Sequence, residues 1–128
     1  MLNAENCSLK ICGTEMDYIS FSSGEQTLVM LPGLGDALKT VKGSAVSFSM
    51  LYRIFARDFK VFVFSRKNRL PSEYSIPDMA DDQARAMKTL GITNAYVMGI
   101  SQGGMIAMRL AAEHPELVSR LVLRFLRK

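Results

Sequence analysis

The residues with the clearest chemical meaning are Gly99-Ile100-Ser101-Gln102-Gly103, which form the pattern G-x-S-x-G. This pattern is typical of a serine nucleophile placed on a sharp turn from a strand into a helix. Side chains at the two glycine positions would collide with the neighbouring strand and helix. The N–H groups that begin the helix favour negative charge that develops on a substrate oxygen. The pattern predicts that Ser101 attacks a carbonyl carbon; the alternative is a glycine-rich turn with an incidental serine.

The segments around this motif alternate between short apolar runs and longer helical patterns, which indicates βαβ units and a parallel sheet. We expect one or two strands within residues 7–21, and single strands at 27–31, 60–64, 95–98 and 118–123. Helices are expected around residues 48–55, 76–90 and 103–113, with a polar loop at 65–74. The fold class is therefore α/β, a three-layer αβα arrangement with a mostly parallel sheet of about six strands.

Two further patterns support this organisation. Ser75, Pro77 and Asp78 form a helix-capping pattern at the start of the second expected helix. Pro32-Gly33-Leu34-Gly35 follows the expected strand at 27–31. A turn at that position is expected to supply a second backbone donor for an oxyanion.

Three segments, in this order, resemble the α/β-hydrolase family and in particular its small bacterial esterase-like members: LPGLGD, SIPDMADDQARAMKTLGI and YVMGISQGGMIAMRLAAEHPELVSRLVL. The resemblance implies that Ser101 is the nucleophile and that a small-molecule ester is hydrolysed through an acyl-serine intermediate. It also implies an oxyanion hole made by the backbone N–H groups of Gln102 and Leu34, with Gly33 and Gly35 beside the bound substrate. Many relatives carry histidine at the position of Pro32, a difference that leaves the Leu34 N–H in place.

The acid and the histidine of this family's catalytic triad follow the serine in the chain and come from loops after later strands. The 128 residues contain a single histidine, His114. The expected helix from Gly103 to His114 is roughly 16 Å long, whereas a general base must come within about 3 Å of the proton it takes. No aspartate is well placed as the triad acid. We therefore expect one partial domain over residues 1–128, a truncated α/β-hydrolase fold with negligible activity on its own.

In the family's sheet order, the expected strand Val118–Leu123 pairs with a further strand, so here it should form an exposed apolar edge. Such edges pair readily with other chains. Two alternatives to an inactive truncated hydrolase follow from this edge. A separate chain that carries the C-terminal half would supply the acid and histidine of a split hydrolase. Otherwise, the protein is a non-catalytic module that binds a partner or self-associates through the edge.

The composition argues against several other classes of protein. The formal net charge is +4, from 16 Lys+Arg against 12 Asp+Glu, but the basic residues lack the interleaved aromatic residues of a nucleic-acid site. No apolar run approaches the ~18 residues of a membrane span, and the first residues lack a signal-peptide pattern. We expect a cytoplasmic protein that binds neither nucleic acid nor membrane. The lone histidine excludes a multi-histidine metal site, and Cys7 and Cys12 match no metal spacing, so neither a metal nor a cofactor is expected.

Overall fold

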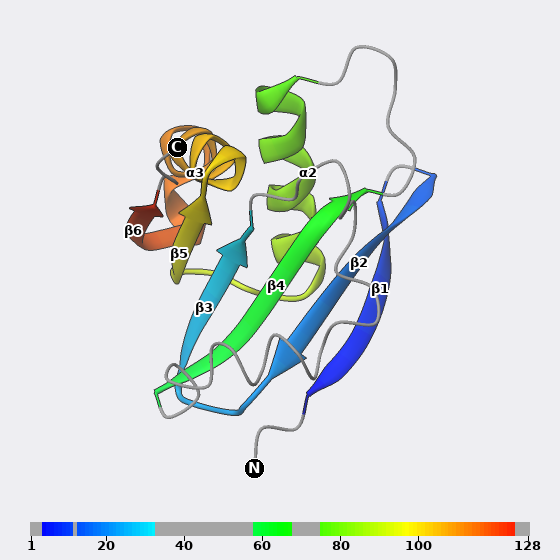
Figure 1. Ribbon diagram of the computed structural model, residues 1–128, viewed down its shortest axis with the longest axis vertical. Helices are drawn as coiled ribbons and strands as arrows, with labels where there is room; N and C mark the ends of the chain where they lie inside the picture. Colours follow the sequence, from blue (N-terminus) through cyan, green and yellow to red (C-terminus); the bar gives the residue numbers. More distant parts are fainter. Residues whose placement is uncertain (1–3, 12, 33–57, 68–74, 125–128) are drawn as a thin grey trace.

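A computed structural model describes residues 4–11, 13–32, 58–67 and 75–124 of the chain. These residues form a six-stranded sheet with the strand order β1-β2-β4-β3-β5-β6, on which two α-helices pack (Figure 1). The strands are β1 (Glu5–Ile11), β2 (Thr14–Phe21), β3 (Gln26–Leu31), β4 (Phe59–Lys67), β5 (Ala95–Ile100) and β6 (Val118–Arg124). The helices are α2 (Ile76–Thr89) and α3 (Gln102–Glu113), followed by the short 3-10 helix η2 (Pro115–Leu117).

The sheet is mixed, and its parallel half carries the Ser101 motif. β4, β3, β5 and β6 are parallel neighbours, whereas β1 pairs antiparallel with β2, and β2 pairs antiparallel with β4. The prediction of a mostly parallel sheet of about six strands is confirmed, with an antiparallel hairpin at one edge. β6 pairs only with β5 among the described strands, so it forms the other edge.

β4 extends further than the sequence pattern predicts. The polar composition after Phe64 predicts a loop, and this prediction is wrong as far as Lys67, where the strand ends. Antiparallel pairing with β2 reaches the pair Met16↔Lys67. The Ser65 hydroxyl is fully buried and donates to the Asp17 carbonyl at 2.6 Å. A polar side chain that forms a hydrogen bond with a backbone carbonyl can lie in a buried strand. The prediction from residue polarity therefore placed the end of β4 too early in the sequence.

α2 begins where the capping pattern predicts. The Ser75 hydroxyl accepts from the Asp78 backbone N–H at 3.3 Å, and the Ser75 N–H donates to the Asp78 carboxylate at 3.0 Å. These bonds satisfy N–H groups that lack a partner inside the helix. Ala80, Ala84 and Met87 are buried at helical spacing, so this face of α2 packs on the sheet.

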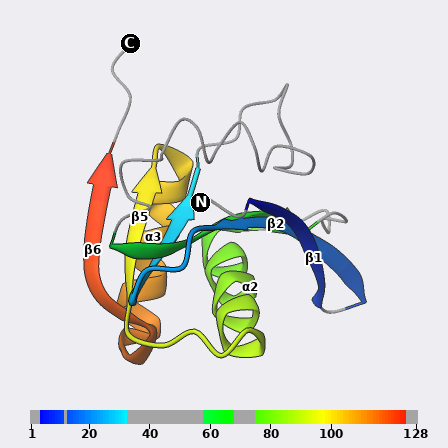
Figure 2. The ribbon, with the colours of Figure 1, turned by 90° about the horizontal axis from the view of Figure 1, so that it is seen from below.

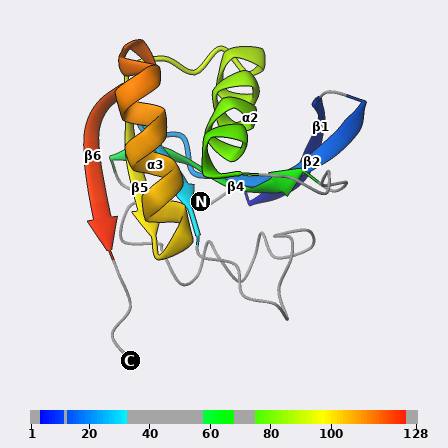
Figure 3. The same cartoon turned by 90° about the horizontal axis from the view of Figure 1, so that it is seen from above.

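Apolar side chains on the two faces of the sheet form two clusters, and alternate residues of β3 divide between them. Val29 and Leu31 belong to the cluster beneath α2 and α3, whereas Leu28 and Met30 belong to the opposite face. Figures 2 and 3 show α2 and α3 side by side on one face of the sheet. The third helix that the sequence predicts, around residues 48–55, lies outside the described residues. Neither described α-helix is long and apolar enough to cross a membrane.

Candidate active site

Ser101 lies between β5 and α3, at the carboxyl end of the parallel strands (Figure 1). We call residues 99–103 the elbow. The Ser101 backbone has φ 54° and ψ −120°, whereas residues with a side chain seldom adopt a positive φ. Strained backbone of this kind concentrates at functional sites. The side chain is partly exposed, and its hydroxyl does not cap α3. The turn therefore has the strand-to-helix geometry that G-x-S-x-G patterns adopt.

The two glycines of the elbow are required by close contacts with backbone atoms. A Cβ atom on Gly103 would lie 1.8 Å from the Leu31 carbonyl oxygen, and one on Gly99 would lie 2.4 Å from the Gly103 carbonyl oxygen. Real Cβ atoms essentially never approach another atom within 3.0 Å. The first contact joins the elbow to the end of β3, and the second folds β5 tightly against the start of α3. The steric reason for the glycine spacing is thus visible in the structure.

Two backbone hydrogen bonds fix the position of Ser101. Its N–H donates to the Arg124 carbonyl at 2.7 Å, and its carbonyl accepts from the Gly104 N–H at 2.9 Å. The first bond continues the β5–β6 ladder just past the pair Ile100↔Arg124. The sequence did not predict the contact between Arg124 and Ser101, because the predicted strand stops at Leu123. The contact follows from the register of the parallel pairing between β5 and β6.

One of the two expected oxyanion donors lies in the described part of the chain. Gln102 is the first residue of α3, and its side chain is exposed. The first turn of α3 carries no acidic side chain, so no carboxylate of this turn offsets the positive end of the helix dipole. The other expected donor, Leu34, lies outside the described residues, as do the pocket residues Gly33 and Gly35.

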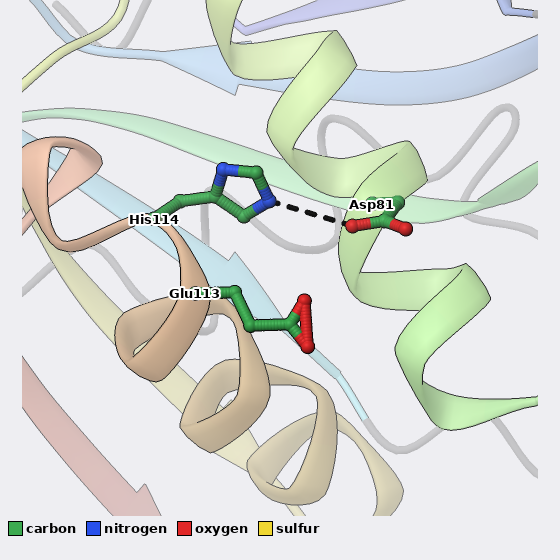
Figure 4. A group of neighbouring side chains, drawn as sticks. All are labelled: Asp81, Glu113 and His114. Carbon is green, nitrogen blue, oxygen red and sulfur yellow. Dashed lines mark hydrogen bonds and ion pairs between the residues drawn. The ribbon is translucent and has the colours of Figure 1, made fainter.

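The single histidine lies at the opposite end of α3 from Ser101. His114 is the C-cap of this helix, whose 12 residues span about 18 Å. Figure 4 shows its Nε2 facing the Asp81 carboxylate on α2, at 3.4 Å from Oδ1. Its Nδ1 lies 4.0 Å from Glu116 Oε2. Because a general base must lie within about 3 Å of the proton it takes, His114 is too far from Ser101 for that role, as expected from the sequence.

Four of the described aspartates have other places in the fold. Asp78 caps α2, and Asp81 contacts His114. Asp58 comes directly before β4. The amino ends of the parallel strands and the elbow lie at opposite ends of these strands. Asp82 is buried within α2. These positions give none of the four the place of a triad acid.

Other features of the described surface belong to the β1–β2 hairpin and to the amino ends of the parallel strands. One cavity is lined by the β1–β2 hairpin, including Cys7 and Lys10. Another is lined by residues at the amino ends of the parallel strands, including Thr27 and Arg120. In the hairpin, burial and then the neighbouring Cys7 thiol raise the pKa of Tyr18. None of these groups belongs to the elbow.

Comparisons with known proteins agree with this arrangement. Residues 26–124 match the family model of the alpha/beta hydrolase fold. RutD of Serratia proteamaculans, a candidate carbamate hydrolase, is 36% identical over 97 residues, which cover 75% of this chain and 36% of that protein. Among solved structures, Cfl2 from Burkholderia cenocepacia has a TM-score of 0.78 at 17% identity, and the match covers 94% of this chain and 40% of that one.

A candidate alpha/beta hydrolase from Nostoc sp. PCC 7120 has a TM-score of 0.75 at 25% identity, and the match covers 94% of this chain and 42% of that one. The chain thus spans less than half of the length of each of these three proteins. The family match runs from the start of β3 to the end of β6, so it includes the elbow and the strand whose last carbonyl holds Ser101. The chain belongs to the alpha/beta hydrolase fold family.

Proposed function

We propose that this chain is the nucleophile-bearing part of a serine hydrolase that cleaves small-molecule esters through an acyl-Ser101 intermediate. The elbow carries this proposal, because Ser101 holds a strained positive φ at the carboxyl end of β5. The Ser101 oxygen bonds to the substrate carbonyl carbon, and the hydroxyl proton passes to a base and then to the departing alcohol. Water then cleaves the acyl-serine ester, which releases the carboxylic acid and restores the hydroxyl.

The backbone N–H groups of Gln102 and Leu34 are the proposed donors to the oxyanion that forms during attack. Gln102 supports this role by its place as the first residue of α3, because the positive end of the helix dipole favours negative charge there. Donors of this kind act on charge that develops in the transition state, so they accelerate the reaction rather than merely bind the substrate. Gly33 and Gly35 are proposed to lie beside the bound ester.

The base and the acid of this reaction are proposed to come from residues other than these 128. The sequence contains one histidine, and His114 is held against Asp81 at the far end of α3. In subtilisin, loss of the catalytic histidine alone lowers kcat by about 10⁶. We therefore expect the chain alone to hydrolyse esters at a negligible rate, with only weak residual activity from oxyanion donors.

Assay of the purified chain tests this expectation. Hydrolysis of a short-chain nitrophenyl ester is compared between the unaltered chain and Ser101→Ala, with circular dichroism to show that both are folded. The two proteins should hydrolyse the ester equally slowly. Robust turnover that vanishes in Ser101→Ala would show that the chain contains a complete catalytic site. The Serratia relative is named for carbamates, so a nitrophenyl carbamate is the second substrate to assay.

The proposed compartment of the protein is the cytoplasm.

A second candidate function is association with another polypeptide through β6, and the exposed apolar residues of this strand favour it. Leu121 is 37% exposed, Val122 46% and Leu123 36%. With Met105 and Met108 of the adjacent α3, they are the large apolar side chains that the described residues leave exposed. The partner is either a chain that supplies the acid and the histidine, or a second copy of this chain.

Purification from the native cell, followed by size-exclusion chromatography with light scattering, distinguishes these partners. A one-to-one complex with another hydrolase-like chain supports a split enzyme. A self-assembly without that chain supports an oligomerising module. A monomer that co-purifies with no other chain counts against both.

A further inference from the structure

The contact between α2 and α3 brings together three side chains of types that bind metals. Asp81 projects from α2, and Glu113 and His114 lie at the end of α3. One oxygen from each carboxylate and one imidazole nitrogen lie within 4.8 Å of one another. Figure 4 shows the ring and the two carboxylates directed toward the space between the two helices. The cluster therefore combines a nitrogen ligand with oxygen ligands from two separate elements.

The spacing between His114 and Asp81 fits two ligands of one cation. Nε2 and Oδ1 are 3.4 Å apart, which is longer than the roughly 2.7–3.2 Å of an ordinary N–H···O hydrogen bond. Two atoms bound to one zinc ion at about 2.1 Å, with tetrahedral angles, lie about 3.4 Å from each other. The nearest Glu113 oxygen lies within 4.8 Å of the other two ligand atoms. Because Glu113 is partly exposed, a change of its rotamer can shorten these distances to about 3.4 Å.

The residues around the cluster favour binding of a cation by the His114 imidazole. Nδ1 of His114 lies 4.0 Å from Glu116 Oε2. At 4.0 Å the two groups share no hydrogen bond, whereas metal-bound histidines commonly donate one from the second ring nitrogen to a carboxylate, so the Glu116 side chain would move closer when the metal binds. Glu113 also pairs with Arg109, whose side chain is 51% exposed. Exposed pairs of this spacing contribute little to stability, so a cation can displace the guanidinium.

We propose that Asp81, Glu113 and His114 bind one zinc ion that ties α2 to α3. One imidazole with two carboxylates suits zinc, whereas calcium and magnesium prefer oxygen ligands alone. The two carboxylates balance the charge of the cation. The site lies about 18 Å from the elbow along α3, so it serves stability and takes no part in hydrolysis. Sequence spacing hides it, because Asp81 and His114 are 33 residues apart.

Zinc titration of the tag-free full chain tests the proposal. Cys7 and Cys12 are replaced by serine in all samples, since thiols also bind zinc. Metal is removed with a chelator, and zinc is added in competition with a chromophoric chelator. We expect one zinc ion per chain, with affinity at least about tenfold weaker in Asp81→Asn, Glu113→Gln and His114→Gln. Glu25→Gln alters an exposed acid outside the cluster and should leave the affinity unchanged.

Two further measurements keep the test decisive. The chain has a single histidine, so nitrogen NMR of the imidazole shows directly whether Nε2 shifts when zinc is added. The thermal midpoint should also rise with zinc in the starting protein and not in His114→Gln. No stoichiometric binding, binding that survives His114→Gln, or an Nε2 signal that stays in place at saturating zinc would each overturn the proposal.

Discussion

The backbone N–H of Ser101 donates a hydrogen bond to the carbonyl of Arg124 at 2.7 Å. In a parallel ladder, the N–H and the C=O of one residue face the same neighbouring strand, and alternate residues face opposite sides. Arg124 and Val122 therefore direct their backbone groups toward β5, whereas Leu121 and Leu123 direct theirs to the outer edge. The inner side of β6 fixes the elbow, and the outer side is where another strand can pair.

Proline substitutions should separate these two sides of β6. Val122→Pro removes an N–H that faces β5 and should lower the free energy of unfolding by about 1–3 kcal/mol, the cost of leaving a buried carbonyl without its donor. Leu123→Pro removes an N–H that faces outward and should cost clearly less, because sheet edges tolerate proline. Urea unfolding followed by circular dichroism measures both values. Equal losses would contradict the assigned alternation.

The outer edge should also control any association of the chain. Leu123→Pro removes a donor that a partner strand needs, so it should disperse a self-assembly or weaken the binding of a second chain. Sedimentation velocity of the unaltered chain and of Leu123→Pro gives the result. An assembly that persists unchanged would place the interface elsewhere on the molecule. Ser101 is untouched by this substitution.

Gly103→Ala should be among the most damaging substitutions in the described chain. It places a Cβ atom 1.8 Å from the Leu31 carbonyl oxygen, so β3 and α3 would have to move apart. We expect a loss of about 4 kcal/mol or more, or failure to fold. Gly13→Ala is the matched control, because Gly13 has φ 81° and nothing lies within 4 Å of its added Cβ. Its cost should be only the backbone strain of about 1–2 kcal/mol.

Chemical denaturation compares these two alanine variants directly. Similar losses at both positions would contradict the close approach between α3 and β3. A large loss only at Gly103 would support it, since the elbow packs there against the end of β3.

Tyr18 should make the stability of the protein fall at high pH. Burial, and then the Cys7 thiol, raise the pKa of Tyr18 above its usual 10.0. The unfolded chain therefore releases this proton first, so the contribution is complete below the unfolded pKa and declines as the pH rises toward the folded pKa. Thermal midpoints measured across this range should fall less steeply for Tyr18→Phe than for Tyr96→Phe. The same slope in both variants would contradict the assignment.

The parts of the fold that depend on neighbours in the sequence could be predicted. Ser75 and Asp78 cap α2 through contacts within one helical turn. The elbow was predictable for the same reason, because Gly99 and Gly103 lie on either side of Ser101 and the turn is local. The start of α3 and the strand before it follow from that turn.

The parts that depend on distant pairing could not be predicted in this way. Ser65 is polar yet buried, because its hydroxyl donates a hydrogen bond to the carbonyl of Asp17, which lies on another strand and 48 residues away in the sequence. Arg124 became visible as a site residue only through the register of β6 against β5. The cluster at Asp81 and His114 likewise needs the packing of α2 on α3. Leu34 remains a prediction from the family pattern.

The most direct measurement of the role of Ser101 supplies the base and the acid that we propose come from other residues. In a chimera, this chain replaces the matching part of the Serratia relative, whose later residues are kept. We expect the chimera to hydrolyse a nitrophenyl ester or carbamate and a fluorophosphonate probe to label Ser101, with both lost in Ser101→Ala. A folded chimera in which hydrolysis and labelling survive Ser101→Ala, or in which neither occurs at all, would contradict Ser101 as the nucleophile.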